Sequence, residues 1–177
     1  MFESARICFR KVTADDASIY HAWRNDPAVM KTTSLSLDVF TLEETAAFVQ
    51  NVILGSSSGK SYMIIDKASA NPIGITSLIQ LDEKNRNAEC IIDLGEKEFW
   101  GKGYATEALK LLLDYAFLEL NLHRVSLRVF SFNEKAIRLY EKLGFTHEGR
   151  SRQSVFRDGQ WHDICHMGML QSEYVRD

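Results

Sequence analysis

The sequence predicts one α/β domain, and three observations support this fold class. Strand-like and helix-like patterns alternate along the chain, and no segment rich in Gly, Pro or Ser is long enough to separate two domains. A glycine turn at residues 101–103 joins an apolar strand pattern to a long helical pattern. The length of 177 residues suits a single domain with a substantial core, so residues 1–177 are predicted to form one domain.

The first half of the chain predicts one strand, two helices and then three strands. Residues 7–12 predict the first strand, and Thr13 with Asp16 predicts the start of a helix that runs to Trp23. A second helix is predicted over 42–54, because apolar residues recur along one side of it. The three predicted strands cover residues 62–65, 73–81 and 88–94.

The second half predicts two helices and three strands. The helical pattern after residue 133 places Ile137 and Tyr140 on the sheet, and Gly144 is a typical residue to end such a helix. The other predicted elements are a helix over 105–120, a strand over 124–130, and two final strands around a turn at 157–160.

Composition excludes several functional classes. Hydrophobic residues make up 45% of the chain and charged residues 25%, as in ordinary globular proteins. A net charge of −3 without a basic block argues against a nucleic-acid partner. The three cysteines are too few and scattered for a disulfide or zinc framework, so we expect no metal. With no signal-peptide pattern and no apolar run long enough for a membrane span, we expect a cytoplasmic protein without a membrane partner.

The most informative segment is residues 99–108, which read Phe-Trp-Gly-Lys-Gly-Tyr-Ala-Thr-Glu-Ala. Two glycines between a strand and a helix let the backbone approach a ligand closely. The first amides of the helix are unpaired and its dipole is positive there, which together favour a phosphate. Lys102 adds a positive charge. The segment therefore predicts a cradle for a phosphorylated cofactor.

Two common phosphate-binding motifs do not fit this chain. A dinucleotide fingerprint needs a third glycine and an acidic residue about 20 positions on, where this chain has Thr106 and Asn121. A P-loop needs four residues between its glycines, whereas the candidate at residues 55–61 has three and precedes a strand pattern. We therefore interpret residues 55–61 as a flexible loop.

Two motifs resemble those of a known family. Residues 100–105 resemble the acetyl-CoA-binding motif of the GNAT N-acetyltransferase superfamily, Arg/Gln-x-x-Gly-x-Gly/Ala. Gly103 and Ala105 match that motif, while Trp100 replaces its usual first residue. Residues 133–145 resemble the family's second signature, Asn-x-x-Ala-x-x-x-Tyr-x-x-x-Gly-Phe. The two motifs occur in the family's order and at its usual separation.

The resemblance implies a fold and an activity. The fold would be a mixed, mostly antiparallel, twisted sheet of about seven strands, with helices on both faces and a splay between the fourth and fifth strands. The activity would be acetyl transfer from acetyl-CoA to a primary amine by direct attack. Residues 23–27 and 158–161 resemble the branch that acts on ribosomal-protein N-termini, polyamines and related amines, so the acceptor would be a small amine such as a polyamine, or a protein N-terminus. A homodimer is compatible with the sequence.

Two other functions are open at the level of sequence. The domain could be a catalytically silent acyl-CoA-binding or sensor module, which would bind CoA without releasing thiol in the presence of any amine. It could also be a different nucleotide-binding enzyme that uses the same Gly-Lys-Gly turn.

The resemblance also implies roles for individual residues. Tyr140 would protonate the leaving thiolate, and Asn133 would contact the pantetheine while capping its helix. A backbone N–H at the end of the strand over 88–94 would stabilise charge on the thioester oxygen. The residues expected to bind the cofactor are Ile92, Leu94, Trp100, Gly101, Lys102, Gly103, Tyr104, Ala105, Thr106, Asn133, Ala136 and Tyr140.

The general base is less sharply defined by the sequence. Glu89 opens the strand that leads to the cradle, and the resemblance implies a carboxylate there that acts through water; an exposed edge carboxylate is the alternative. Asp93 is a weaker candidate, because alternation could place it on the same face as Glu89. Asp26, Glu43 and Glu44 could meet a cationic substrate or form a solvated face.

Overall fold

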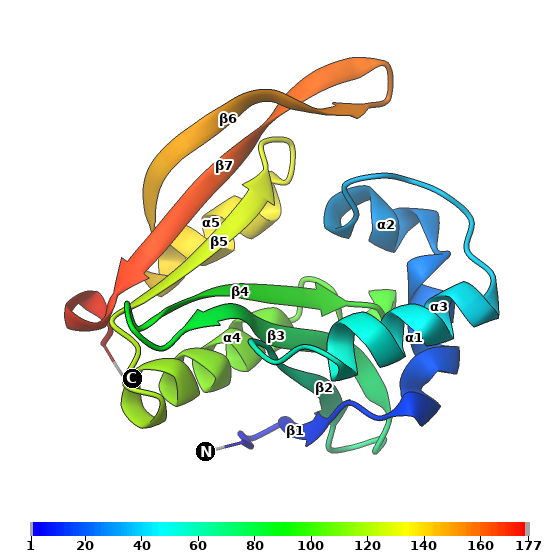
Figure 1. Cartoon of the computed structure of the whole chain (residues 1–177), viewed down its shortest axis with the longest axis horizontal. Coiled ribbons are helices and arrows are strands. Elements are labelled where there is room, and N and C mark those ends of the chain that lie inside the picture. The colour runs from blue at the N-terminus through cyan, green and yellow to red at the C-terminus, as the bar shows by residue number, and fades with distance from the viewer. Residues whose placement is uncertain (1, 176–177) are drawn as a thin grey trace.

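A computed structural model describes residues 2–175 (Figure 1). The strands are β1 (Ile7–Lys11), β2 (Lys60–Asp66), β3 (Pro72–Asp82), β4 (Asn87–Leu94), β5 (Arg124–Phe130), β6 (Thr146–Arg157) and β7 (Gln160–Leu170). The helices are α1 (Ala17–Arg24), α2 (Pro27–Thr33), α3 (Leu42–Phe48), α4 (Tyr104–Asp114) and α5 (Glu134–Leu143). Wider helical turns extend α3 to Leu54 and α4 to Glu119.

The seven strands form one sheet in the order β1-β2-β3-β4-β5-β7-β6. Every neighbouring pair is antiparallel except β4 and β5, which run parallel. The parallel pairing joins Asn87–Glu89 to Arg124–Ser126, after which the two strands diverge (Figure 1). The predicted fold class, a mixed and mostly antiparallel sheet splayed between the fourth and fifth strands, is confirmed.

Helices cover both faces of the sheet. On one face, Ile75 of β3 packs with Trp23 of α1 and Val29 of α2. On the other, Cys90 of β4 packs with Leu109 of α4, in a core that also contains part of α5. Because paired strand residues point to the same face, Asp93, which pairs with Ile75, projects toward α1–α3.

Helix α2 is the element that the sequence pattern missed. Asp26 precedes it and accepts a hydrogen bond from the Ala28 N–H at 2.9 Å, while Pro27 occupies the first helical position. Seven residues are too few to establish a helical period. The interpretation of residues 55–61 as a loop is confirmed, since β2 begins only at Lys60.

The tip of the β6–β7 hairpin is joined to α2 across the splay. Arg157 is 4% exposed and donates hydrogen bonds to the carbonyls of Lys31 at 2.9 Å and Ser34 at 2.7 Å. Beside it, Lys31 forms an ion pair with Asp158 at 2.6 Å. These contacts link the two halves of the sheet at the mouth of the opening between β4 and β5.

No helix in the described part of the chain is long and apolar enough to cross a membrane.

Candidate active site

A cleft of about 1780 Å³ passes through the sheet where β4 and β5 diverge. One wall, which we call the acceptor side, comes from α1–α3 and their loops and includes Tyr20, Arg24, Thr33, Phe40 and Phe48. The opposite wall, the cofactor side, comes from the ends of α4 and α5; the residues on it that the sequence singled out are Gly101, Gly103, Tyr104, Ala105, Thr106, Asn133, Ala136 and Tyr140.

The glycine turn has the backbone conformation that the sequence predicted. Gly101 and Gly103 have φ angles of +71° and +84°, in the left-handed region that favours glycine. The first hydrogen bond inside α4 runs from the Glu107 N–H to the Gly103 carbonyl at 3.1 Å. The amides of residues 104–106 therefore precede the helical ladder, as an anion site at a helix N-terminus requires.

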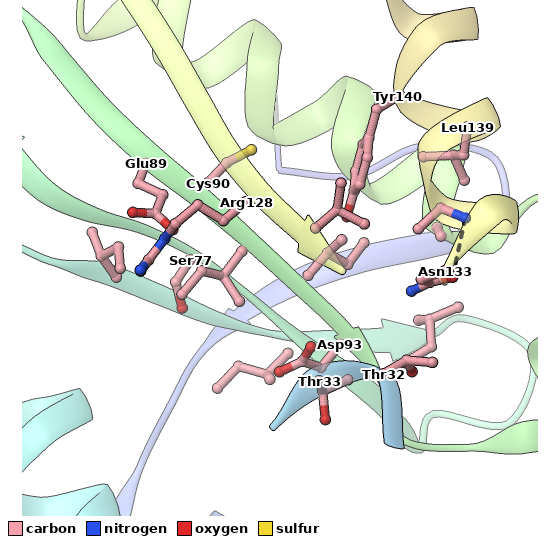
Figure 2. Close-up of a pocket in the computed structure, with 18 of the residues that line it drawn as sticks. Thr32, Thr33, Ser77, Glu89, Cys90, Asp93, Arg128, Asn133, Leu139 and Tyr140 are labelled. Atoms are coloured by element: carbon pink, nitrogen blue, oxygen red, sulfur yellow. Dashed lines mark hydrogen bonds and ion pairs between the residues drawn. The ribbon is translucent and has the colours of Figure 1, made fainter. Parts of the chain in front are cut away.

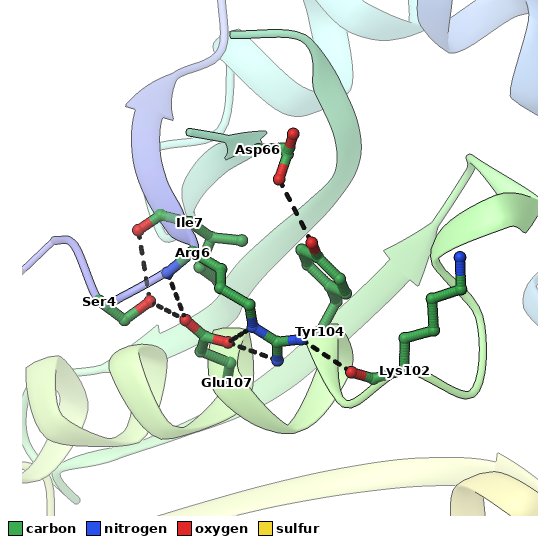
Figure 3. A network of polar contacts seen from close by, with 7 residues as sticks. All are labelled: Ser4, Arg6, Ile7, Asp66, Lys102, Tyr104 and Glu107. Atoms are coloured by element: carbon green, nitrogen blue, oxygen red, sulfur yellow. Dashed lines mark hydrogen bonds and ion pairs between the residues drawn. The ribbon is translucent and has the colours of Figure 1, made fainter. Parts of the chain in front are cut away.

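A network behind the turn fixes its position (Figure 3). Arg6 donates to the Lys102 carbonyl at 2.9 Å and forms an ion pair with Glu107 at 2.6 Å. Glu107 also accepts hydrogen bonds from Ser4 and from the Arg6 backbone N–H. Burial alone would raise the pKa of Glu107, but these contacts lower it below its ordinary value, so the carboxylate stays charged and holds the turn.

Most of the residues expected to bind the cofactor line this cleft. Trp100 is exposed, and its indole N–H donates to the Leu94 carbonyl at 2.8 Å, which links the end of β4 to the turn. Ile92 lies on the same strand and also lines the cleft. Lys102 is not among the described residues that line it; its side chain is exposed on the turn (Figure 3).

Tyr140 lies on the cofactor side, with its ring near the divergence of the strands (Figure 2). The residue is 9% exposed, and its ring centroid is 5.9 Å from that of Phe145. Burial, and then the proximity of Cys90 and Asp93, raise the pKa of Tyr140 above its ordinary value. The phenol therefore stays protonated at neutral pH, which is the form that a proton donor must have.

Asn133 begins α5 as the sequence predicted. Its side-chain oxygen accepts a hydrogen bond from the Ala136 N–H at 3.3 Å, so its capping role is confirmed. Both residues line the cleft beside Tyr140. A contact between Asn133 and the pantetheine remains a prediction.

The two candidate bases of β4 differ in their surroundings (Figure 2). Glu89 accepts a hydrogen bond from Arg128 Nε at 2.8 Å, so one of its oxygens is engaged in an ion pair. Asp93 is half-buried at the floor of the cleft. Burial raises the pKa of Asp93 to about 7, where a carboxyl group can both accept and release a proton near neutral pH.

No sequence motif pointed directly to the acceptor side. Phe40 and Phe48 come from a loop and from α3, and neither belongs to a motif. Arg24 lies within residues 23–27, which indicated a branch of the family but no site. These side chains meet only because α1 and α3 pack together on one face of the sheet, a non-local contact that no sequence pattern records.

Comparisons with known proteins agree with this geometry. A family model described as an acetyltransferase (GNAT) domain matches residues 6–146. An uncharacterized N-acetyltransferase, p20, of Bacillus licheniformis is 31% identical over 172 residues, which are 96% of each chain. A putative ribosomal N-acetyltransferase, YdaF, of Bacillus subtilis is 40% identical over 101 residues, 57% of this chain and 55% of the relative.

Among solved structures, the fold is similar to that of a spermidine N-acetyltransferase from Vibrio cholerae in complex with CoA and spermine. The TM-score is 0.87 and the sequence identity 30%, and the match covers 97% of this chain and 99% of that one.

Proposed function

The chain belongs to the GNAT acetyltransferase family, and on that premise we propose which of its residues carry out acetyl transfer from acetyl-CoA to a primary amine. The observation that carries the proposal is the divergence of β4 from β5. It opens a passage through the sheet, with a proton acceptor facing one wall and a proton donor on the other.

The turn and the start of α4 fit the diphosphate of CoA. The amides of residues 104–106 offer hydrogen-bond donors at the positive end of the helix dipole. The space beside Gly101 is open: a Cβ added there would have no atom within 4 Å, so a ligand can approach the backbone closely. From this cradle a thioester arm would lie along β4 toward Asn133 and Tyr140, which line the same cleft.

Asp93 and Tyr140 divide the proton transfers between them. Alkylamines have a pKa near ~10 and arrive protonated, so Asp93, on the face of α1–α3, accepts the proton that frees the nucleophile. Tyr140, on the opposite side, donates a proton to the departing sulfur. Holding the amine and the thioester together in the cleft supplies much of the remaining rate enhancement. Attack is direct, so none of the cysteines acts as a nucleophile.

Glu89 is assigned a supporting place. Because its carboxylate is engaged by Arg128, it is less free to take a proton than Asp93. The pair fixes the Arg128 side chain at the edge of the cleft, just past Ser126, where the parallel pairing on β5 ends. Proton transfer from the amine to Glu89 through water remains the competing proposal, which separate substitutions of the two acids can test.

Charge stabilisation on the thioester oxygen is assigned to the backbone of β4. Past Glu89 this strand pairs with β3 but has left β5, so the side of its backbone that faces the opening can meet a ligand. We assign donation to the developing negative charge to a backbone N–H between Ile92 and Leu94, residues that line the cleft.

Thiol release from acetyl-CoA in the presence of an amine panel tests the function. The panel holds polyamines, amino acids, amino-acid amides, peptides with free N-termini and amino sugars. We expect release with at least one class, and a rise in melting temperature with CoA that NAD and ATP do not produce. A CoA-induced rise without release from any amine would support the silent binding module instead.

Substitution of Gly103 tests the cradle. Its φ of +84° is strained for any L-residue, and an added Cβ would lie 3.4 Å from Arg6 Nη2, so Gly103→Val should displace the amides that begin α4. We expect CoA to bind at least about tenfold more weakly by calorimetry, in line with a strain of order 1–3 kcal/mol.

Gly149→Val is the matched control for Gly103→Val, because Gly149 lies in β6, away from the cleft, with open space at its Cβ. Equal CoA affinity in the two variants would contradict the cradle. The predicted homodimer and cytoplasmic location remain predictions.

A further inference from the structure

Arg24 occupies an unusual position on the acceptor side of the cleft. It ends α1, and its guanidinium carbon lies 3.6 Å from the ring centroid of Phe40 and 4.6 Å from that of Phe48. All three residues line the cleft. The two rings hold the guanidinium in one place, since stacking on aromatic faces is favourable for this planar cation.

The guanidinium of Arg24 lacks a partner for part of its donor set. Its Nη1 atom is buried without a hydrogen-bond partner among the described residues. A buried donor that has lost water and found no acceptor costs free energy, and a cationic donor costs more than a neutral one. A carboxylate entering the cleft would supply the missing acceptor in the geometry that guanidinium groups favour.

The acidic groups of this wall do not neutralise Arg24. Asp93 and Arg24 both lie near Tyr20. Burial and then the charge of Asp93 raise the pKa of Tyr20 to about 12, whereas the charge of Arg24 acts to lower it. Arg24 Nη1 nevertheless has no hydrogen-bond partner among the described residues, Asp93 included, and burial alone raises the pKa of Asp93. Glu89 is already paired with Arg128.

Two of the three acids that could have attracted a cationic substrate, Asp26 and Glu44, serve elsewhere. Asp26 forms an ion pair with Lys97 at 2.5 Å and caps α2. Glu44 caps α3 by accepting from the Thr41 N–H at 2.7 Å. Neither acid is among the described residues that line the cleft, and Glu89, which does line it, is already paired with Arg128, so a polycation on the acceptor side would meet the charge of Arg24.

We propose that Arg24, held between Phe40 and Phe48, is a subsite for a carboxylate of the acceptor, which is therefore a primary amine that carries a carboxylate, and not a polyamine. This inference rests on the proposed acetyl transfer, because it names the acceptor of that same site. The amine of such an acceptor lies toward Asp93 and Tyr140, and its carboxylate toward α1 and α3.

Matched acceptor pairs test the subsite. Each pair is an amino acid and its carboxamide. An acidic peptide amide is added to distinguish free amino acids from peptide acceptors, and spermidine represents the polycations. We expect wild-type kcat/KM for the carboxylates to exceed that for the amides by roughly ten- to a hundredfold, the usual range for a charged hydrogen bond. Spermidine should rank below both.

The variants localise the preference. In Arg24→Gln the ratio of carboxylate to amide should fall to about one, whereas Arg24→Lys, which keeps the charge, should retain part of it. Arg152→Gln, an exposed arginine on β6 outside the cleft, is the matched control and should keep the wild-type ratio. Melting temperatures confirm that each variant is folded.

Three outcomes would overturn the inference. If the wild-type enzyme preferred amides or spermidine, the proposed carboxylate subsite would be wrong, although acetyl transfer itself would stand. A ratio retained in Arg24→Gln together with a raised KM for acetyl-CoA would assign Arg24 to the cofactor. Failure of every amine to release thiol would overturn the proposed function itself.

Discussion

Replacing Tyr140 with phenylalanine is expected to lower kcat about a hundredfold, with little change in the affinity for CoA. The substitution removes one hydroxyl from a buried ring and leaves its packing against Phe145 in place. General acid catalysis contributes about 10²- to 10⁴-fold, and a thiolate of pKa about 8.5 is a fair leaving group, so the lower end of that range applies. Steady-state kinetics and calorimetry with CoA separate the two effects.

Tyr62→Phe is the matched control for this experiment. Tyr62 is also buried, on β2, but it lies outside the cleft. Loss of the Tyr62 hydroxyl should change the melting temperature more than it changes kcat. If both variants retained wild-type kcat, Tyr140 would be a packing residue only. A rise in the Kd for CoA that matched the fall in kcat would make it a binding residue.

The second large effect is expected for Asp93→Asn. Burial raises the pKa of Asp93 to about 7, so the basic form of the group grows as pH rises to that value. Wild-type kcat/KM should therefore rise through an inflection near pH 7, followed by the further rise that accompanies deprotonation of the amine. In Asp93→Asn the inflection near 7 should be absent and kcat/KM about a hundredfold lower.

Glu89→Gln distinguishes the two candidate bases. Because Glu89 is paired with Arg128, its substitution should lower the rate by a smaller factor and leave the inflection in place. Loss of the inflection in Glu89→Gln, with its retention in Asp93→Asn, would return the role of base to Glu89.

Stability gives an independent reading of Asp93. Its pKa in the folded state, about 7, lies above its unfolded value near 3.8, so the folded protein binds more protons between these values. The contribution of Asp93 to stability is therefore fully present below the unfolded pKa and is lost as pH rises through the folded pKa. The Asp93→Asn variant has no such pH-dependent loss. The melting temperature of the variant minus that of the wild type should therefore be more positive at about pH 8 than at about pH 5.

Local chemistry explains which parts of the site could be predicted. A left-handed φ at Gly103 and a capping side chain at Asn133 are requirements of a few consecutive residues, and both appear in the structure. Tyr140 follows from the period of its own helix. These features depend on neighbours within one or two turns, so the sequence records them directly.

Contacts between distant segments were not predictable in the same way. Helix α2 is a short helix that depends on its cap and on two buried residues, and the bond from Arg157 to the end of that helix joins positions more than 120 apart in the chain. The ion pair between Glu89 and Arg128 likewise joins two strands. No periodicity signals such pairs, because they arise only when whole elements pack.

Sequence alone predicted the order of the strands and of every helix except α2, the glycine turn before α4 and the helix that carries Tyr140, since each depends on short-range geometry and hydrogen bonding. The remaining features of the site arise from the packing of distant segments. This packing paired Glu89 with Arg128, buried Asp93 and enclosed Arg24 between two rings. Charge and desolvation depend on everything packed around a group, and only the folded chain brings those neighbours together.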